Sequence, residues 1–110
     1  MSRQHHFHLD RAGHSITIDL RRGRTSEVWL LVDGRETGLR RERSSDVVTL
    51  DGELADDPPQ RFTVRVEHVR ERSGLPICTL MLGDSELPVP ERVGPTDFWD
   101  RRPGRQLGTE

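Results

Sequence analysis

Apolar and polar residues alternate with a period of two along most of the chain, which is typical of β-strands that bury one face. Gly, Pro, Asp and Ser interrupt the alternation at short intervals, as they do in all-β sandwiches and barrels. No segment keeps a helical period. The pattern therefore predicts an all-β fold, an antiparallel β-sandwich or flattened barrel of about seven or eight short strands joined by hairpins.

The first hairpin is predicted to turn at residues 12–13, an Ala-Gly pair. Apolar residues alternate with polar ones on both sides of this turn. A two-residue loop there places Leu9 opposite Ile16 and Phe7 opposite Ile18. One face of the hairpin is then consistently apolar, and we expect it to face the core.

The strongest turn signal is Asp33-Gly34, because both residue types accept the positive φ angles of a type I′ turn. The register that this turn implies pairs Glu27 with Arg40, Val28 with Leu39 and Trp29 with Gly38. Both faces of residues 28–32 carry large apolar side chains, so this strand should be central or covered on both sides. We expect Trp29 to lie under the C-terminal tail, a second sheet or a partner.

The second half of the chain carries further turn signals. We expect a third, shorter turn at Asp51-Gly52, and a loop over residues 55–60 that divides the domain into two halves. The Gly83-Asp84 pair suits a type II′ turn. Two prolines, at 88 and 90, predict that the last strand is a sheet edge, because proline has no N–H to donate to a neighbouring strand.

The length of 110 residues predicts one domain. We place it at residues 1–92 and expect residues 93–110, which are rich in Pro, Gly and Arg, to form a flexible tail. The tail carries the aromatic pair Phe98-Trp99 outside any strand pattern, so these rings need an apolar surface of their own chain or of a partner.

Composition indicates the cell compartment and limits the partners. The net charge of −2 does not attract nucleic acid or anionic membranes, and neither is expected as a partner. A single cysteine, Cys78, and an N-terminus without an apolar segment favour the cytoplasm. All basic residues are Arg, which suggests a GC-rich bacterial genome.

Histidines near the N-terminus suggest one site for a metal. In the predicted register His6, His8 and Asp19 share the outer face of the first hairpin, and two histidines with one carboxylate are a known ligand set. The alternative is a solvated strand face with no group to orient the imidazoles. We adopt that alternative and expect no cofactor.

A second pair, His68 and Cys78, could meet across two strands and form a minimal nucleophile. Both residues continue apolar faces, so we expect them in the core. Three groups of arginines could grip phosphates, but interspersed carboxylates favour solvated loops: 21, 22 and 24; 40, 41 and 43; and 101, 102 and 105. No catalytic motif is present in the sequence, and we predict that the protein is not an enzyme.

The segment ITIDLRRGRTSEVWLLVDGRE, residues 16–36, resembles the strand, Gly-x-Thr-Ser loop, strand and Val-Asp-Gly hairpin of the Fas apoptotic inhibitory molecule family. The later segment FTVRVEHVRERSGLPICTLMLGDSEL is similar to that family's later hairpins in pattern. The resemblance implies a compact antiparallel β-sandwich that has no catalytic residues and acts through protein contacts.

These observations favour a non-enzymatic cytoplasmic module that binds a protein partner or a second copy of itself. The candidate contact residues are Trp29, Phe98 and Trp99, together with an exposed sheet edge. The alternative is a barrel-like protein, with or without enzymatic activity, that holds a small ligand or a metal in its interior.

Overall fold

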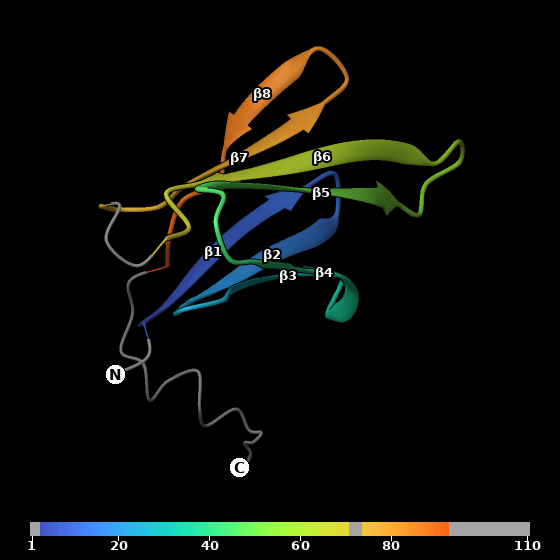
Figure 1. The fold of residues 1–110 in the computed structure, drawn as a ribbon. Helices are drawn as coiled ribbons and strands as arrows, with labels where there is room; N and C mark the ends of the chain where they lie inside the picture. Colours follow the sequence, from blue (N-terminus) through green and yellow to red (C-terminus); the bar gives the residue numbers. More distant parts are fainter. Residues whose placement is uncertain (1–2, 71–73, 93–110) are drawn as a thin grey trace.

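The computed structural model describes residues 3–70 and 74–92, and within them the chain forms antiparallel strands in two four-stranded sheets, with no helix (Figure 1). The predicted all-β, sandwich-like fold is confirmed. The strands are β1 (Arg3–Arg11), β2 (His14–Arg22), β3 (Ser26–Val32), β4 (Arg35–Glu42), β5 (Val47–Leu54), β6 (Gln60–Glu67), β7 (Ile77–Leu82) and β8 (Ser85–Pro88).

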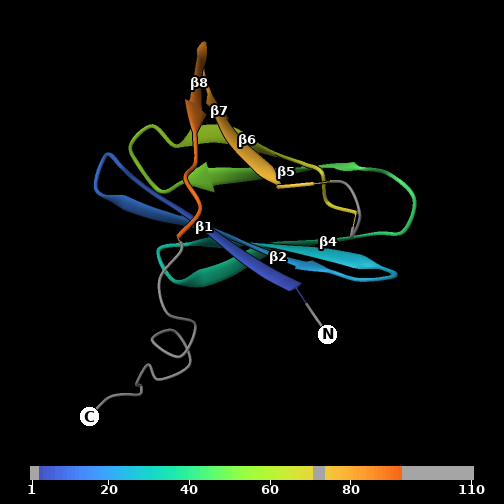
Figure 2. The ribbon, with the colours of Figure 1, turned by 90° about the vertical axis from the view of Figure 1, so that its left-hand side faces the viewer.

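Each sheet is an up-and-down meander, with strand orders β1-β2-β3-β4 and β5-β6-β7-β8. The sheets lie one above the other, and the β7–β8 hairpin projects away from the first sheet (Figure 2). The chain passes from one sheet to the other through residues 43–46. This crossing divides the two halves, so the predicted division at residues 55–60 is wrong: that loop joins β5 to β6 within one sheet.

Residues 89–92 carry the chain back from the second sheet to the first. The Val89 N–H still donates to the Cys78 carbonyl of β7, at 3.0 Å. The Pro90 carbonyl then accepts from the His8 N–H at 3.1 Å, and the Arg92 N–H donates to the His6 carbonyl at 2.7 Å. This return segment closes one side of the sandwich along β1, and the chain leaves the described part at that point.

The core lies between the inner faces of the two sheets. It is built mainly from branched aliphatic residues of β2, β3 and β6, which alternate with outward-facing polar residues as expected. Its buried apolar members are Phe7, Ile16, Ile18, Leu20, Val28, Leu30, Val32, Val48, Leu50, Leu54, Phe62, Val64, Val66, Val69, Cys78, Leu80 and Val89. Apolar side chains therefore occupy the space between the sheets.

The first hairpin has the predicted register. Leu9 lies opposite Ile16 and Phe7 opposite Ile18. The two turn residues, at 12 and 13, have the positive φ angles of 53° and 81° that a tight two-residue turn requires.

The second hairpin turns at Asp33-Gly34 as predicted, with φ angles of 52° and 82°. The predicted pairing beyond the turn is wrong by one residue. Pairing shifts between Leu30 and Leu31, which leaves Thr37 as the extra residue of a β-bulge. The observed pairs are Glu27 with Arg41, Val28 with Arg40, Trp29 with Leu39 and Leu30 with Gly38.

The bulge places Gly38 next to the second sheet. A side chain built on Gly38 would place its Cβ 3.4 Å from Leu50 Cδ2 of β5. Gly38 thus lies on the inner face at ordinary contact distance from β5, and the shift places Leu39 beside Trp29 on the face turned away from the second sheet.

The third predicted turn, at Asp51-Gly52, is absent: both residues lie inside β5. Gly52 pairs with Phe62 of β6, whose ring occupies the space where a side chain of residue 52 would stand. The turn at Gly83 is confirmed, because Leu82 pairs with Ser85 across it and Gly83 has a φ of 60°.

The strand β8 is the last in the order of the second sheet, as its prolines predict. It ends at Pro88, whereas Pro90 belongs to the return segment that pairs with β1. The predicted tail, residues 93–110 with Phe98 and Trp99, lies outside the described residues.

Candidate interaction face on the first sheet

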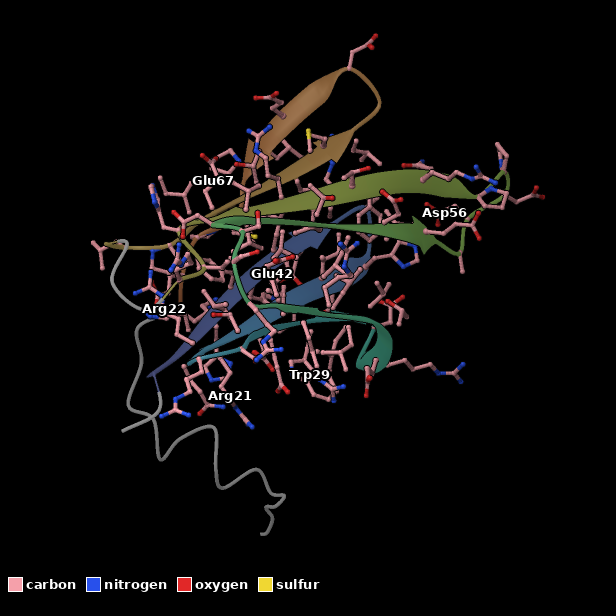
Figure 3. All side chains as sticks on the ribbon, viewed as in Figure 1. Arg21, Arg22, Trp29, Glu42, Asp56 and Glu67 are labelled. Atoms are coloured by element: carbon pink, nitrogen blue, oxygen red, sulfur yellow. The ribbon has the colours of Figure 1, made fainter. Side chains whose placement is uncertain are left out.

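Side chains of the first sheet that point away from the second sheet form three rows across β1 to β4, because directly paired residues share a face. We call these three rows the outer face. The middle row is His6, Asp19, Trp29 and Leu39; the row on one side is Gln4, Arg21, Glu27 and Arg41; the row on the other side is His8, Thr17, Leu31 and Glu36. Figure 3 shows Arg21 and Trp29 on the side of this sheet that faces away from the second one.

The apolar side chains of the outer face lie on β3 and β4, beside the charged residues Glu27, Glu36 and Arg41. Trp29, Leu31 and Leu39 are all partly exposed there. Beside the indole is a hollow of about 220 Å³. The residues that line it are Gln4, Asp19, Leu20, Arg21, Trp29, Leu31 and Glu36. Apolar side chains, two carboxylates and one guanidinium thus meet at one small recess.

The β1 and β2 part of the outer face is polar, and its side chains bind one another. His6 Nδ1 and the Asp19 carboxylate form a hydrogen bond. His8 lies between the hydroxyl of Thr17, 3.0 Å from Nδ1, and the carboxylate of Asp10, which accepts from Nε2 at 2.9 Å. The polar side chains are therefore held in place by these contacts.

The three candidate metal ligands lie on one face, as predicted, but they do not converge. His6 is bonded to Asp19, whereas His8 is in the next row and turns to Thr17 and Asp10. Within residues 3–70 and 74–92, no group of three or more His, Cys, Asp or Glu side chains is arranged to hold a metal ion.

The second candidate pair is separated by the end of a strand. Cys78 is buried, and burial raises the pKa of its thiol to about 12. The prediction that His68 continues the core face is wrong, because β6 ends at Glu67 and His68 has a left-handed backbone with φ 63°. The imidazole is partly exposed, and its Nδ1 lies 3.3 Å from the Asp46 carboxylate.

Sequence reasoning missed the structural role of Arg22, which it had grouped with solvated arginines. Arg22 is buried, and its Nη2 donates to the carbonyls of His68, at 2.6 Å, and of Gly74. Ser26 Oγ donates to the Val69 carbonyl at 2.7 Å. The first sheet therefore holds the segment that follows β6. The one sequence signal for a buried Arg22 is its place in the alternation, two residues after the buried Leu20.

Of the two other arginine groups, one lies on β4 and the residue after it, and the other lies near the C-terminus. Arg41 Nε donates to Glu27 at 3.2 Å on the outer face, and Arg40 extends to the Thr49 carbonyl of β5. The third group, at 101, 102 and 105, lies outside the described residues.

No family model matches the chain, and comparisons with curated proteins and with solved structures found no match either. The resemblance to the Fas apoptotic inhibitory molecule family stays a prediction. The described residues include no helix long and apolar enough to cross a membrane.

Proposed function

We propose that this protein is a non-enzymatic module that binds another protein through the outer face. The supporting observation is Trp29, which lies on the outer face, in one row with Leu39 and beside Leu31, rather than in the core. Tryptophan in a partly exposed apolar setting is the residue type that most often dominates protein interfaces. The paired polar side chains of β1 and β2 supply the polar rim that such interfaces have.

The chemistry of the recess favours a partner segment that carries an arginine or lysine next to an apolar residue. Asp19, Glu36 and Trp29 line the recess together with Arg21, so two carboxylates face one guanidinium there. The carboxylates outnumber Arg21, so a cation placed there is attracted by the net negative charge and by the face of the indole. The neighbouring Leu31 and Leu39 offer contact area to an apolar side chain.

Two further observations support a binding module over the alternative of a ligand-binding barrel. The space between the sheets holds the apolar core cluster, which leaves the outer surfaces for recognition. The one cysteine is buried with a raised pKa, so it does not offer the thiolate that a nucleophile needs. A free buried thiol also suits a reducing compartment, and cytoplasmic location remains part of the proposal.

The proposal is tested by selecting binders from a displayed peptide library with the full-length protein and with Trp29→Ala. We expect the selected peptides to carry Arg or Lys beside an apolar residue, and Trp29→Ala to weaken binding by about 30-fold, as for an interface hot spot. The matched control is Met81→Ala on the outward side of the second sheet, which should bind as the wild type does.

Selection of no peptide, or equal binding by Trp29→Ala, would refute the proposal. A second variant, Phe98→Ala with Trp99→Ala in the full-length chain, separates the aromatic pair from the outer face. If this variant loses binding while Trp29→Ala keeps it, the C-terminal aromatic pair is the contact and the outer face is not.

A further inference from the structure

Three segments of the chain meet at His14, the first residue of β2. Its Nδ1 lies 2.8 Å from the carboxylate of Asp33, in the turn between β3 and β4. Its Nε2 lies 2.7 Å from the carboxylate of Asp56, in the loop between β5 and β6. The imidazole is only 14% exposed. Sequence reasoning missed this contact, because the three residues lie far apart along the chain.

The two carboxylates belong to different sheets. Asp33 is fixed in the first sheet, since its carboxylate accepts from the Ser15 N–H at 2.9 Å and its own N–H donates to the Ser15 carbonyl at 2.8 Å. Asp56 lies in the loop that joins β5 to β6 of the second sheet (Figure 3). Its N–H donates to the Leu54 carbonyl of β5 at 2.8 Å. His14 therefore ties the two sheets together, by joining the turn between β3 and β4 to the loop between β5 and β6.

Both contacts need a proton on each nitrogen of His14. An imidazolium has two N–H donors and satisfies both carboxylates, whereas a neutral imidazole has one donor and turns a lone pair toward the other carboxylate. The hydrogen bonds to Asp56 and Asp33 raise the pKa of His14. Arg11, which is paired with His14 across the first turn, is the neighbouring positive charge, and Asp57 follows Asp56 in the loop.

We propose that His14 is a proton-operated clamp that holds the loop of residues 55–59 on the first sheet when it is protonated and releases the loop when it is neutral. This inference concerns a control of the fold and goes beyond the proposed binding function. The same loop joins the strand ends, Gly52 and Glu53 of β5 and Arg61 and Phe62 of β6, that line an open hollow of about 780 Å³. The loop and this hollow are both separate from the residues of the outer face.

The direction with pH follows from the sign of the shift. A group whose pKa is raised by folding stabilises the folded contact below its ordinary value, about 6.5 for histidine, and loses this effect as pH rises through the raised pKa. The clamp is therefore closed in mildly acidic solution and opens above the raised pKa of His14.

Two other histidine–carboxylate pairs join distant segments and require a measurement that resolves single residues. His5 Nδ1 lies 2.6 Å from Glu91 of the return segment, and His68 lies beside Asp46 of the crossing between the sheets. The test is an NMR titration of each imidazole between about pH 5 and pH 9, combined with amide-exchange protection of residues 55–57. The proteins compared are the wild type, Asp56→Asn, and Glu91→Gln as the matched control.

We expect Asp56→Asn to lower the titration midpoint of His14, and Glu91→Gln to leave it unchanged. In the wild type, the amide-exchange protection of the loop should fall as His14 loses its proton. The size of this fall follows from the difference between the His14 midpoints of the wild type and Asp56→Asn, at about tenfold for each pH unit of difference. In Asp56→Asn this pH dependence should vanish.

The proposal would be overturned if the His14 midpoint in Asp56→Asn equalled that of the wild type. It would also be overturned if the amide-exchange protection of the wild-type loop did not change as His14 loses its proton. The wild-type measurement alone decides the second point, so it does not depend on the stability of the variant. The proposed binding function does not use Asp56, so Asp56→Asn should bind a selected peptide as the wild type does at one fixed pH. This measurement separates a failure of the clamp from a failure of the binding function.

Discussion

Replacement of Gly52 by alanine should destabilise the protein far more than one added methyl group suggests. Gly52 lies inside β5, two residues before its end, with Phe62 opposite. A Cβ on residue 52 would lie 2.3 Å from Cζ, 2.7 Å from Cε1 and 2.9 Å from Cε2 of the Phe62 ring, whereas ordinary contact begins at 3.4 Å. The whole ring edge must therefore move.

The ring has little room to move, because Phe62 is 3% exposed and belongs to the core cluster. Forced overpacking in a core costs about 1 to 3 kcal/mol, and an overlap of this depth places Gly52→Ala near the upper limit, at about 3 kcal/mol. For a domain of this size the melting temperature should fall by roughly 10 to 20 °C. Thermal and urea unfolding, followed by circular dichroism, measure both quantities.

The matched control is Gly23→Ala, whose new Cβ meets nothing closer than the Thr25 carbonyl oxygen at 3.6 Å. It should change the free energy of unfolding by less than about 0.5 kcal/mol. In a Phe62→Leu background the cost of Gly52→Ala should shrink, because the ring atoms that cause the overlap are gone. A cost below about 0.5 kcal/mol for Gly52→Ala in the wild-type background would refute the packing argument.

Three more predictions use the same comparison of faces and contacts. Leu30→Ala should lower the free energy of unfolding by about 2 to 5 kcal/mol, because Leu30 is fully buried, whereas Trp29→Ala should lower it by about 1 kcal/mol. Equal losses in urea unfolding would contradict the assignment of these two residues to opposite faces. Arg22→Met should lower the free energy of unfolding by about 2 to 3 kcal/mol, because it removes the donors to two carbonyls. Native-state amide exchange should show residues 68–70 losing protection, and unchanged exchange would argue against this role of Arg22. Cys78 should resist a thiol-reactive probe in the native protein and react after unfolding, and rapid native labelling would contradict its burial and its pKa of about 12.

Turns that depend on their own residues could be predicted from the sequence. Asp33-Gly34 and residues 12–13 form tight turns with positive φ, and the register of the first hairpin follows from its loop length alone. Gly52 shows where this reasoning ends. Asp51-Gly52 has the same local preference as Asp33-Gly34, but the Phe62 ring of the paired strand occupies the space above Gly52, and the strand continues.

The outer face could be predicted only in part. Alternation predicts Trp29 on the side opposite Leu30, but it gives no sign of the bulge at Thr37 that brings Leu39 beside Trp29 and Gly38 next to Leu50 of the second sheet. Such contacts between sheets leave no periodic signal in the sequence. The same holds for the contact between His14 and Asp56, which lie 42 residues apart. The sequence indicates only that Asp56 belongs to a polar loop.

The central claim is that the outer face binds a protein segment, and the most direct test is to map a selected peptide onto the full-length protein by NMR chemical-shift changes. We predict that the largest changes fall on the Trp29 indole N–H and on the amides of Leu31, Leu39 and Asp19. Changes that concentrate on the second sheet or on the β7–β8 hairpin, with the Trp29 indole unmoved, would contradict the claim.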